Sequence, residues 1–320
     1  MSKHNDILAT FAFLATLLVV MCHADDVMTP KTLPVAILGG TFSDANVYNF
    51  FWLSGYFLGR HLEEKHWWSA ALFKRISTLL VPYVMWCVLY FVIRALAGTP
   101  DSIDYPIGFE GIDKLFGIKL GSRPACFPMW YIKTLYLFVF AAPVFTWGLM
   151  RFRSIGARMS LMSGVVILYA CAKYFGLTEL RYFDLGGFKL LGFVFFCGGL
   201  WLSQIRMKNS WLEAIRARAW CVAVGALGVW ILSAVWAHYY GWWYEMNILI
   251  SSACLFLIAC IIRKLPLVLT RNSFFIYGSH IIMLSYLGRR LAGGGALLPH
   301  SPCMPCSRSA LHVWQLLEVK

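Results

Sequence analysis

The chain has 320 residues, of which 60% are hydrophobic and only 13% are charged. Soluble domains carry roughly a quarter charged residues, so this chain has too few polar groups to cover a water-facing exterior, and its composition excludes an ordinary soluble protein. The net charge of +13 would suit nucleic acid in a soluble protein, but cytoplasmic loops of membrane proteins also collect Lys and Arg. We therefore expect contact with a lipid bilayer and no nucleic-acid partner.

Apolar runs recur along the whole chain, and a helix needs about 20 mostly apolar residues to cross a bilayer. The runs lie at 6–23, 46–59, 77–97, 130–150, 159–175, 186–203, 218–237, 246–262 and 274–291. The sequence therefore predicts an all-α fold, a polytopic transmembrane helix bundle of about nine to ten helices. One membrane-embedded domain is expected over 1–291, and 292–320 is expected to be a divergent, poorly ordered tail.

The segments between the runs alternate in charge. The basic set holds Lys3; Arg60, Lys65, Lys74 and Arg75; Arg151, Arg153 and Arg158; Arg206, Lys208, Arg216 and Arg218; and Arg263, Lys264 and Arg271. The acidic set holds Asp25, Asp26 and Asp44; Asp101, Asp104, Glu110 and Asp113; Glu179 and Asp184; and Glu245. Because basic loops stay in the cytoplasm, we predict a multi-pass protein of the cell (inner) membrane with a cytoplasmic amino terminus. A cleaved signal peptide over the first 24 residues is the alternative, but Cys22-His23-Ala24 is a poor cleavage site.

His23 closes the first apolar run and directly precedes Ala24, Asp25 and Asp26. An imidazole held beside carboxylates at a membrane boundary has the chemistry of a general base. A hydrated interfacial histidine explains the same pattern, and the sequence leaves both interpretations open.

The second run places Ser54, Gly55 and Tyr56 inside an aromatic stretch. We expect this short helix to be broken around Ser54-Gly55 and to line a polar path, whereas close helix packing is the alternative for such small residues. Lys74 and Arg75, with Arg60 nearby, offer positive charge for a phosphate-bearing ligand. The inside-positive bias explains the same charges without a ligand.

Two further candidates come from later runs. Trp130-Tyr131 opens the fourth run, and His280 lies within the ninth, where an ionisable group is a functional candidate by default. The sequence has no Ser/His/Asp hydrolase signature, no Gly-rich phosphate loop and no zinc-ligand spacing. We predict no metal and no permanently bound cofactor.

Five of these segments together resemble the acyltransferase-3 family of integral membrane acyltransferases, in the expected order. They are Leu17–His23 in the first run, Phe51–Tyr56, Phe73–Ile76 with Val81-Pro82-Tyr83 and Trp86, Met129-Trp130-Tyr131, and Ser273–Tyr277 with His280.

The resemblance implies transfer of an acetyl or other short acyl group from a cytoplasmic donor such as acetyl-CoA. Its acceptors are hydroxyls of envelope or exported glycans, or lipid-linked sugars, so the expected reaction is O-acetylation in polysaccharide modification. It assigns the catalytic role to His23. Our own hypothesis adds Asp25 or Asp26 to orient His23, and Lys74, Arg75 and Arg60 to bind the donor. Ser54, Tyr56, Trp130, Tyr131 and His280 are our candidates for the pocket.

The sequence departs from the family pattern at Ala12, where the family commonly has an arginine eleven positions before the histidine. A catalytically inactive family member is therefore one alternative. A transporter or flippase for a lipid-linked glycan is the other, with a substrate cavity at mid-membrane and no acyl donor.

Overall fold

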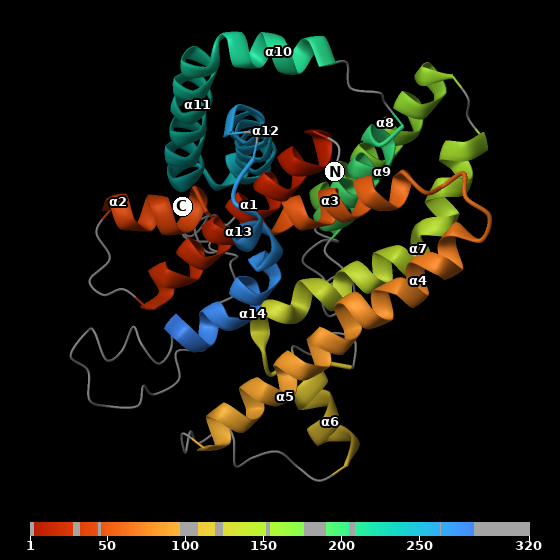
Figure 1. The fold of residues 1–320 in the computed structure, drawn as a ribbon, viewed down its shortest axis with the longest axis vertical. Helices are drawn as coiled ribbons and strands as arrows, with labels where there is room; N and C mark the ends of the chain where they lie inside the picture. Colours follow the sequence, from red (N-terminus) through yellow and green to blue (C-terminus); the bar gives the residue numbers. More distant parts are fainter. Residues whose placement is uncertain are drawn as a thin grey trace, which may run out of the picture. The chain divides into compact units, whose positions relative to one another are not determined.

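A computed structural model describes residues 3–27, 33–43, 46–96, 108–118, 124–151, 154–175, 190–204, 209–262 and 264–284. Every regular element in these ranges is helical, which confirms the all-α prediction (Figure 1). The chain divides into two units, one formed by residues 1–46 with 209–320 and the other by residues 47–208. The predicted tail at 292–320 lies outside the described residues.

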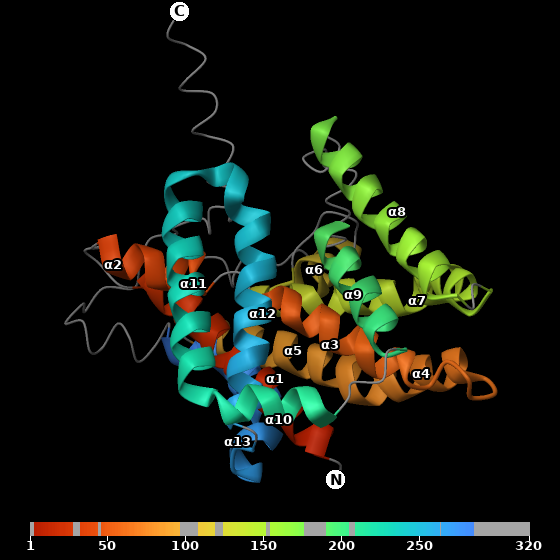
Figure 2. The same ribbon diagram turned by 90° about the horizontal axis from the view of Figure 1, so that it is seen from above.

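The first unit is built on three long helices. Its elements are α1 (Lys3–Val27), α2 (Leu33–Ala36), η1 (Ile37–Thr41), α10 (Asn209–Ala217), α11 (Ala219–Tyr239), η6 (Gly241–Trp243), α12 (Tyr244–Ile262), α13 (Leu267–Arg271) and α14 (Ser273–Met283). The turn η6 joins α11 to α12, which run side by side (Figure 2). Helix α1 packs against α12, where the Phe11 and Phe256 rings meet edge to face at 5.8 Å, and against α14.

A short π-helical turn, η1, anchors the chain after α1 to the helix pair α11–α12. The Thr41 hydroxyl donates to the carbonyl of Ala234 at 2.8 Å, and the Asn247 amide donates to the carbonyl of Thr41 at 2.6 Å. Next to these bonds the Phe42 ring stacks on Trp230 at 4.1 Å. Side-chain donors thus satisfy backbone groups that irregular chain leaves unpaired in an apolar setting.

The second unit contains the remaining helices. They are α3 (Val47–Gly59), α4 (Trp67–Arg75), η3 (Ile76–Leu80), α5 (Val81–Leu96), α6 (Phe109–Phe116), η5 (Phe127–Met129), α7 (Trp130–Arg151), α8 (Ile155–Tyr174) and α9 (Leu190–Leu202). Its tightest pair is α3 with α9. A Cβ atom on Gly55 would lie 2.0 Å from the carbonyl oxygen of Phe196, and one on Gly199 would lie 2.0 Å from that of Trp52. These two positions therefore need glycine, because the backbones approach too closely for any side chain.

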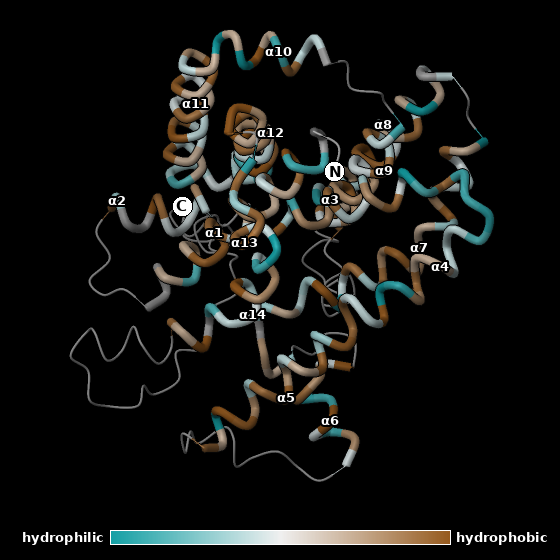
Figure 3. Tube along the Cα trace, viewed as in Figure 1, coloured by the Kyte–Doolittle hydropathy of each residue, from teal (hydrophilic) through white to brown (hydrophobic). Residues whose placement is uncertain are grey.

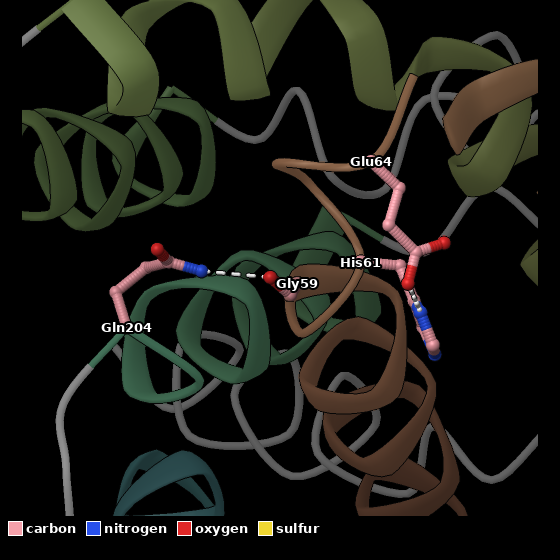
Figure 4. A network of polar contacts seen from close by, with 4 residues as sticks. All are labelled: Gly59, His61, Glu64 and Gln204. Carbon is pink, nitrogen blue, oxygen red and sulfur yellow. Dashed lines mark hydrogen bonds and ion pairs between the residues drawn. The ribbon is translucent and has the colours of Figure 1, made fainter. Parts of the chain in front are cut away.

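Polar contacts fix the ends of this helix pair (Figure 4). The Gln204 amide, just after α9, donates to the carbonyl of Gly59 at 2.7 Å. In the turn that follows α3, Nδ1 of His61 lies 2.6 Å from a carboxylate oxygen of Glu64. The Gln204 bond thus ties the end of α3 to the end of α9, and the His61–Glu64 contact lies within the turn that follows.

Helices α4 and α5 form one continuous span of 30 residues, Trp67–Leu96. The predicted run at 77–97 therefore begins too late, because Trp67, Lys74 and Arg75 are helical and not part of a connecting loop. The turn before Pro82 widens to a π-helix, in which the Val81 amide donates to the carbonyl of Ile76, five residues back. A proline ring collides with the carbonyl four residues before it and donates no hydrogen bond, and the wider turn accommodates both effects.

A second proline lies inside α7, at Pro143. Because Pro143 has no N–H, the carbonyl of Val139, four residues earlier, loses its helical donor. The Trp68 indole N–H donates to that same carbonyl at 3.1 Å. The broken helical bond in α7 is thus replaced by a side chain from α4, as membrane helices require.

Five helices in the described part of the chain are long and apolar enough to cross a membrane, namely Asn5–Ala24, Trp67–Leu96, Trp130–Arg151, Ala219–Tyr239 and Tyr244–Ile262. Figure 3 shows the apolar colour predominating along α12, for example. The other four predicted runs coincide with α3, α8, α9 and α14, which are helical but do not meet the same criterion of length and composition. For the runs at 186–203 and 274–291, residues 186–189 and 285–291 lie outside the described residues.

Helix α6 is fixed to α5 and α7 by two side chains. The Tyr83 hydroxyl donates to the carbonyl of Phe116 at 2.5 Å, and the Lys133 ammonium donates to that of Gly117. Cys126 is fully buried in the turn that leads into α7. Burial, together with the neighbouring Cys87 thiol, raises the pKa of Cys126 to about 12, so this thiol is protonated at neutral pH.

Candidate functional site

The predicted site residues fall into the two units. The first unit contains His23, Asp25, Asp26 and His280, and the second contains Ser54, Tyr56, Arg60, Lys74, Arg75, Trp130 and Tyr131. Each set is therefore described by itself.

The structure brings two of the predicted residues, His23 and His280, into direct contact. His23 lies near the end of α1, where the apolar run gives way to Asp25 and Asp26. His280 lies in the last turn of α14, which packs on α1. Their rings stack with centroids 5.1 Å apart and planes inclined by 28°. His23 is half-buried, whereas His280 is only 4% exposed.

The hydrogen bonds of His280 fix its tautomer. Its Nδ1 lies 2.5 Å from the carbonyl oxygen of Tyr277, one turn earlier in α14. A carbonyl only accepts, so Nδ1 carries the hydrogen and, in the neutral ring, Nε2 carries a lone pair. Nε2 is buried, and within the described residues no group donates to it.

The contact also limits the charge of the histidine pair. Two positive rings about 5 Å apart repel each other by about 3 kcal/mol at an effective dielectric constant of about 20. The stacked arrangement therefore suits one positive charge on the pair and not two. Such a pair can accept and return one proton, which is the task of a general base.

Asp25 and Asp26 lie in the last turn of α1, but their side chains lie outside the described part of the structure. Their predicted role in orienting His23 stays a prediction.

In the second unit, the predicted donor-binding Arg75 meets the predicted pocket residue Ser54. The Arg75 guanidinium donates to the carbonyl of Ser54 across a long 3.4 Å contact and is half-buried at the end of α4. Lys74 and Arg60 are exposed. Arg75 thus has one side engaged with α3, while Lys74 beside it stays accessible to a ligand.

The predicted break around Ser54-Gly55 is wrong, because α3 is a continuous helix from Val47 to Gly59. Gly55 serves the contact with α9, which agrees with the helix-packing interpretation of this pair. The accessible polar group here is the Lys74 side chain, not an unwound backbone.

The predicted aromatic residues pack along α3. The ring of Tyr131, which is buried, lies 5.7 Å from that of Phe50, and the Trp130 ring lies 6.1 Å from that of Phe51. Tyr56 stacks on Trp52 at 5.6 Å. Trp130 and Tyr131 therefore belong to the contact between α7 and α3, and only Trp130 and Tyr56 retain partial exposure.

Sequence reasoning missed two features of these sites. It treated His23 and His280 as independent candidates, and it did not anticipate the bond from Trp68 to Val139. The presence of Pro143 in an apolar run was the available signal for the second. Nothing in the sequence signalled the first beyond the presence of both histidines in motifs of one family.

A family model described as an acyltransferase domain matches residues 13–302, which include both histidines. The chain belongs to this acyltransferase family. It is therefore a multi-pass membrane acyltransferase, as its sequence predicted. None of the curated proteins and none of the solved structures compared with the chain matches it.

Proposed function

We propose that this acyltransferase moves an acetyl or other short acyl group from acyl-CoA in the cytoplasm to a hydroxyl of an envelope or exported glycan. His23 is the general base, and Lys74 and Arg75 contact the donor. The contact between His23 and His280 is the observation that supports the proposal most directly.

The chemistry balances as follows. A nitrogen lone pair of His23 takes the hydroxyl proton while the hydroxyl oxygen attacks the acyl carbonyl carbon. The carbon–sulfur bond of the thioester breaks, and the proton passes from His23 to the departing thiolate, giving the ester and free coenzyme A. A base in this position contributes about 10²–10⁴-fold to a rate.

The charge pattern supports a cytoplasmic donor. Exposed Lys74 and half-buried Arg75 belong to the basic set that we assign to the cytoplasm. Cationic side chains of this kind suit the phosphates of coenzyme A. We accordingly place the protein in the cell (inner) membrane with its amino terminus in the cytoplasm.

The test uses inverted membrane vesicles that contain the protein, supplied with radiolabelled acetyl-CoA. We expect label on glycan that mild base removes, because an O-ester is cleaved under these conditions. His23→Ala should reduce this label to background. His238→Ala is the matched control, because His238 also ends a spanning helix, α11, but is not one of the proposed site residues.

Wild-type label that resists mild base would rule out an O-ester product. Full labelling with the His23→Ala variant would rule out His23 as the base. Glycan export that needs this protein but no acyl donor would favour the transporter instead.

A further inference from the structure

We infer that His280 is a positioning residue that fixes the tautomer and orientation of the His23 ring. The inference rests on the proposed function, since it takes His23 as the base. It assigns to a neutral imidazole the role for which the sequence had suggested Asp25 or Asp26.

One ring nitrogen of His280 keeps a lone pair that none of the described residues satisfies. Its Nδ1 is committed to the carbonyl of Tyr277, so Nε2 is left as an acceptor. That atom is buried and receives no hydrogen bond from the described residues. An acceptor buried without a donor is costly, and native proteins rarely leave one in that state.

His23 contacts His280 and has a ring nitrogen that can donate to this lone pair. The His23 ring lies against the His280 ring, with 5.1 Å between the centroids. The planes of the two rings are inclined to each other by only 28°. In this stacked arrangement the N–H of His23 points along its own ring plane. A hydrogen bond to Nε2 of His280 therefore requires the half-buried His23 side chain to rotate out of the stack.

The resulting chain of hydrogen bonds has one direction. The acceptor hydroxyl donates to His23, His23 donates to Nε2 of His280, and Nδ1 of His280 donates to the Tyr277 carbonyl. His23 is then held in the tautomer whose free lone pair faces the hydroxyl. When His23 takes the proton, its positive charge faces a lone pair and not a second charge.

The experiment compares two isosteric variants in protein reconstituted into lipid nanodiscs. Acetyl-CoA is the donor and envelope polysaccharide extracted from the host cells is the acceptor. In His280→Gln the amide oxygen reaches the position of Nε2 and accepts from His23. In His280→Asn the shorter amide reaches only the position of Nδ1, so it restores the bond to Tyr277 but not the one to His23.

Because a general base contributes about 10²–10⁴-fold, we expect His280→Asn to lower kcat about 100-fold. The KM for acetyl-CoA should stay the same, and His280→Gln should retain kcat within about threefold. Equal kcat values for the Asn and Gln variants would overturn the inference, as would a change confined to KM.

A third variant guards against misfolding of the Asn protein. In His280→Gly, free imidazole can fill the vacated space, and kcat should rise with the imidazole concentration. Absence of this rescue would also overturn the positioning role. The proposed function itself fails if His23→Ala keeps full activity or if the wild type transfers no label. The inference alone fails if His23→Ala is inactive but the His280 variants behave like the wild type.

Discussion

Replacing Gly199 with alanine should loosen the contact between α9 and α3, the helix that contains Ser54 and Tyr56. The added Cβ atom would lie 2.0 Å from the carbonyl oxygen of Trp52 and 2.7 Å from the amide nitrogen of Tyr56. Both are backbone atoms, so no side-chain rotation relieves the overlap, and the two helices must separate. Overpacking of this kind costs typically about 1–3 kcal/mol and occasionally more.

The neighbouring Gly198 provides a matched control, because a Cβ atom there meets nothing within 4 Å. Removing glycine from a helix interior gains roughly 0.5–1 kcal/mol. Both variants remove a glycine from the interior of α9, so this gain is common to them. We therefore expect Gly198→Ala to be neutral or stabilising and Gly199→Ala to be less stable than it by about 1–3 kcal/mol.

The assay is thermal unfolding of the two detergent-solubilised variants, followed by the loss of the monodisperse peak in size-exclusion chromatography. At roughly 2–4 °C per kcal/mol for a large domain, the two midpoints should differ by several degrees. Equal midpoints would refute the reasoning, because they would mean that the backbones of α3 and α9 do not approach as closely as the geometry requires.

Two further predictions follow from other contacts in the second unit. Trp68→Phe removes the donor to the Val139 carbonyl and should lower the free energy of unfolding by about 1–3 kcal/mol. In a Pro143→Ala background the same change should cost little, because a backbone N–H is available again. Equal losses in both backgrounds, measured by thermal unfolding, would contradict this. The Cys126 thiol, whose pKa is raised to about 12 by burial, should resist a water-soluble maleimide at pH 7.5 in a variant that keeps only this cysteine. It should react once the protein is denatured, and rapid labelling of the folded protein would disprove its burial.

The sequence was sufficient to predict the class of fold, because composition and apolar runs depend only on the bilayer as solvent. It placed the helix ends less well. The start of the third run was set at 77, since Lys74 and Arg75 looked like loop residues, whereas the helix extends back to Trp67. Lys and Arg can lay their long apolar stems along a helix while the charged head reaches water, so they are tolerated inside such helices, and hydropathy alone does not register this.

The candidate site was predictable residue by residue, but its contacts were not. His23 and His280 are 257 positions apart in sequence, so their stacking depends on how α1 and α14 pack. The suggested break at Ser54-Gly55 failed for a related reason. Small polar residues permit either an unwound segment or a close helix contact. Here Gly55 makes a close contact with α9, and α3 stays helical.

Pro82 and Pro143, which lie inside the spanning helices Trp67–Leu96 and Trp130–Arg151, have a common consequence for the proposed donor-binding residues. Pro82 is accommodated by the π-helical turn Ile76–Leu80, which inserts extra backbone between α5 and the end of α4 and so changes the face on which Arg75 emerges. Pro143 frees the Val139 carbonyl, to which Trp68 binds, and this bond holds the start of α4 on α7. Arg75 then contacts the Ser54 carbonyl of α3. The placement of Arg75 against α3 therefore depends on how the chain accommodates these two prolines, which the charge pattern that first marked Arg75 as a candidate does not register.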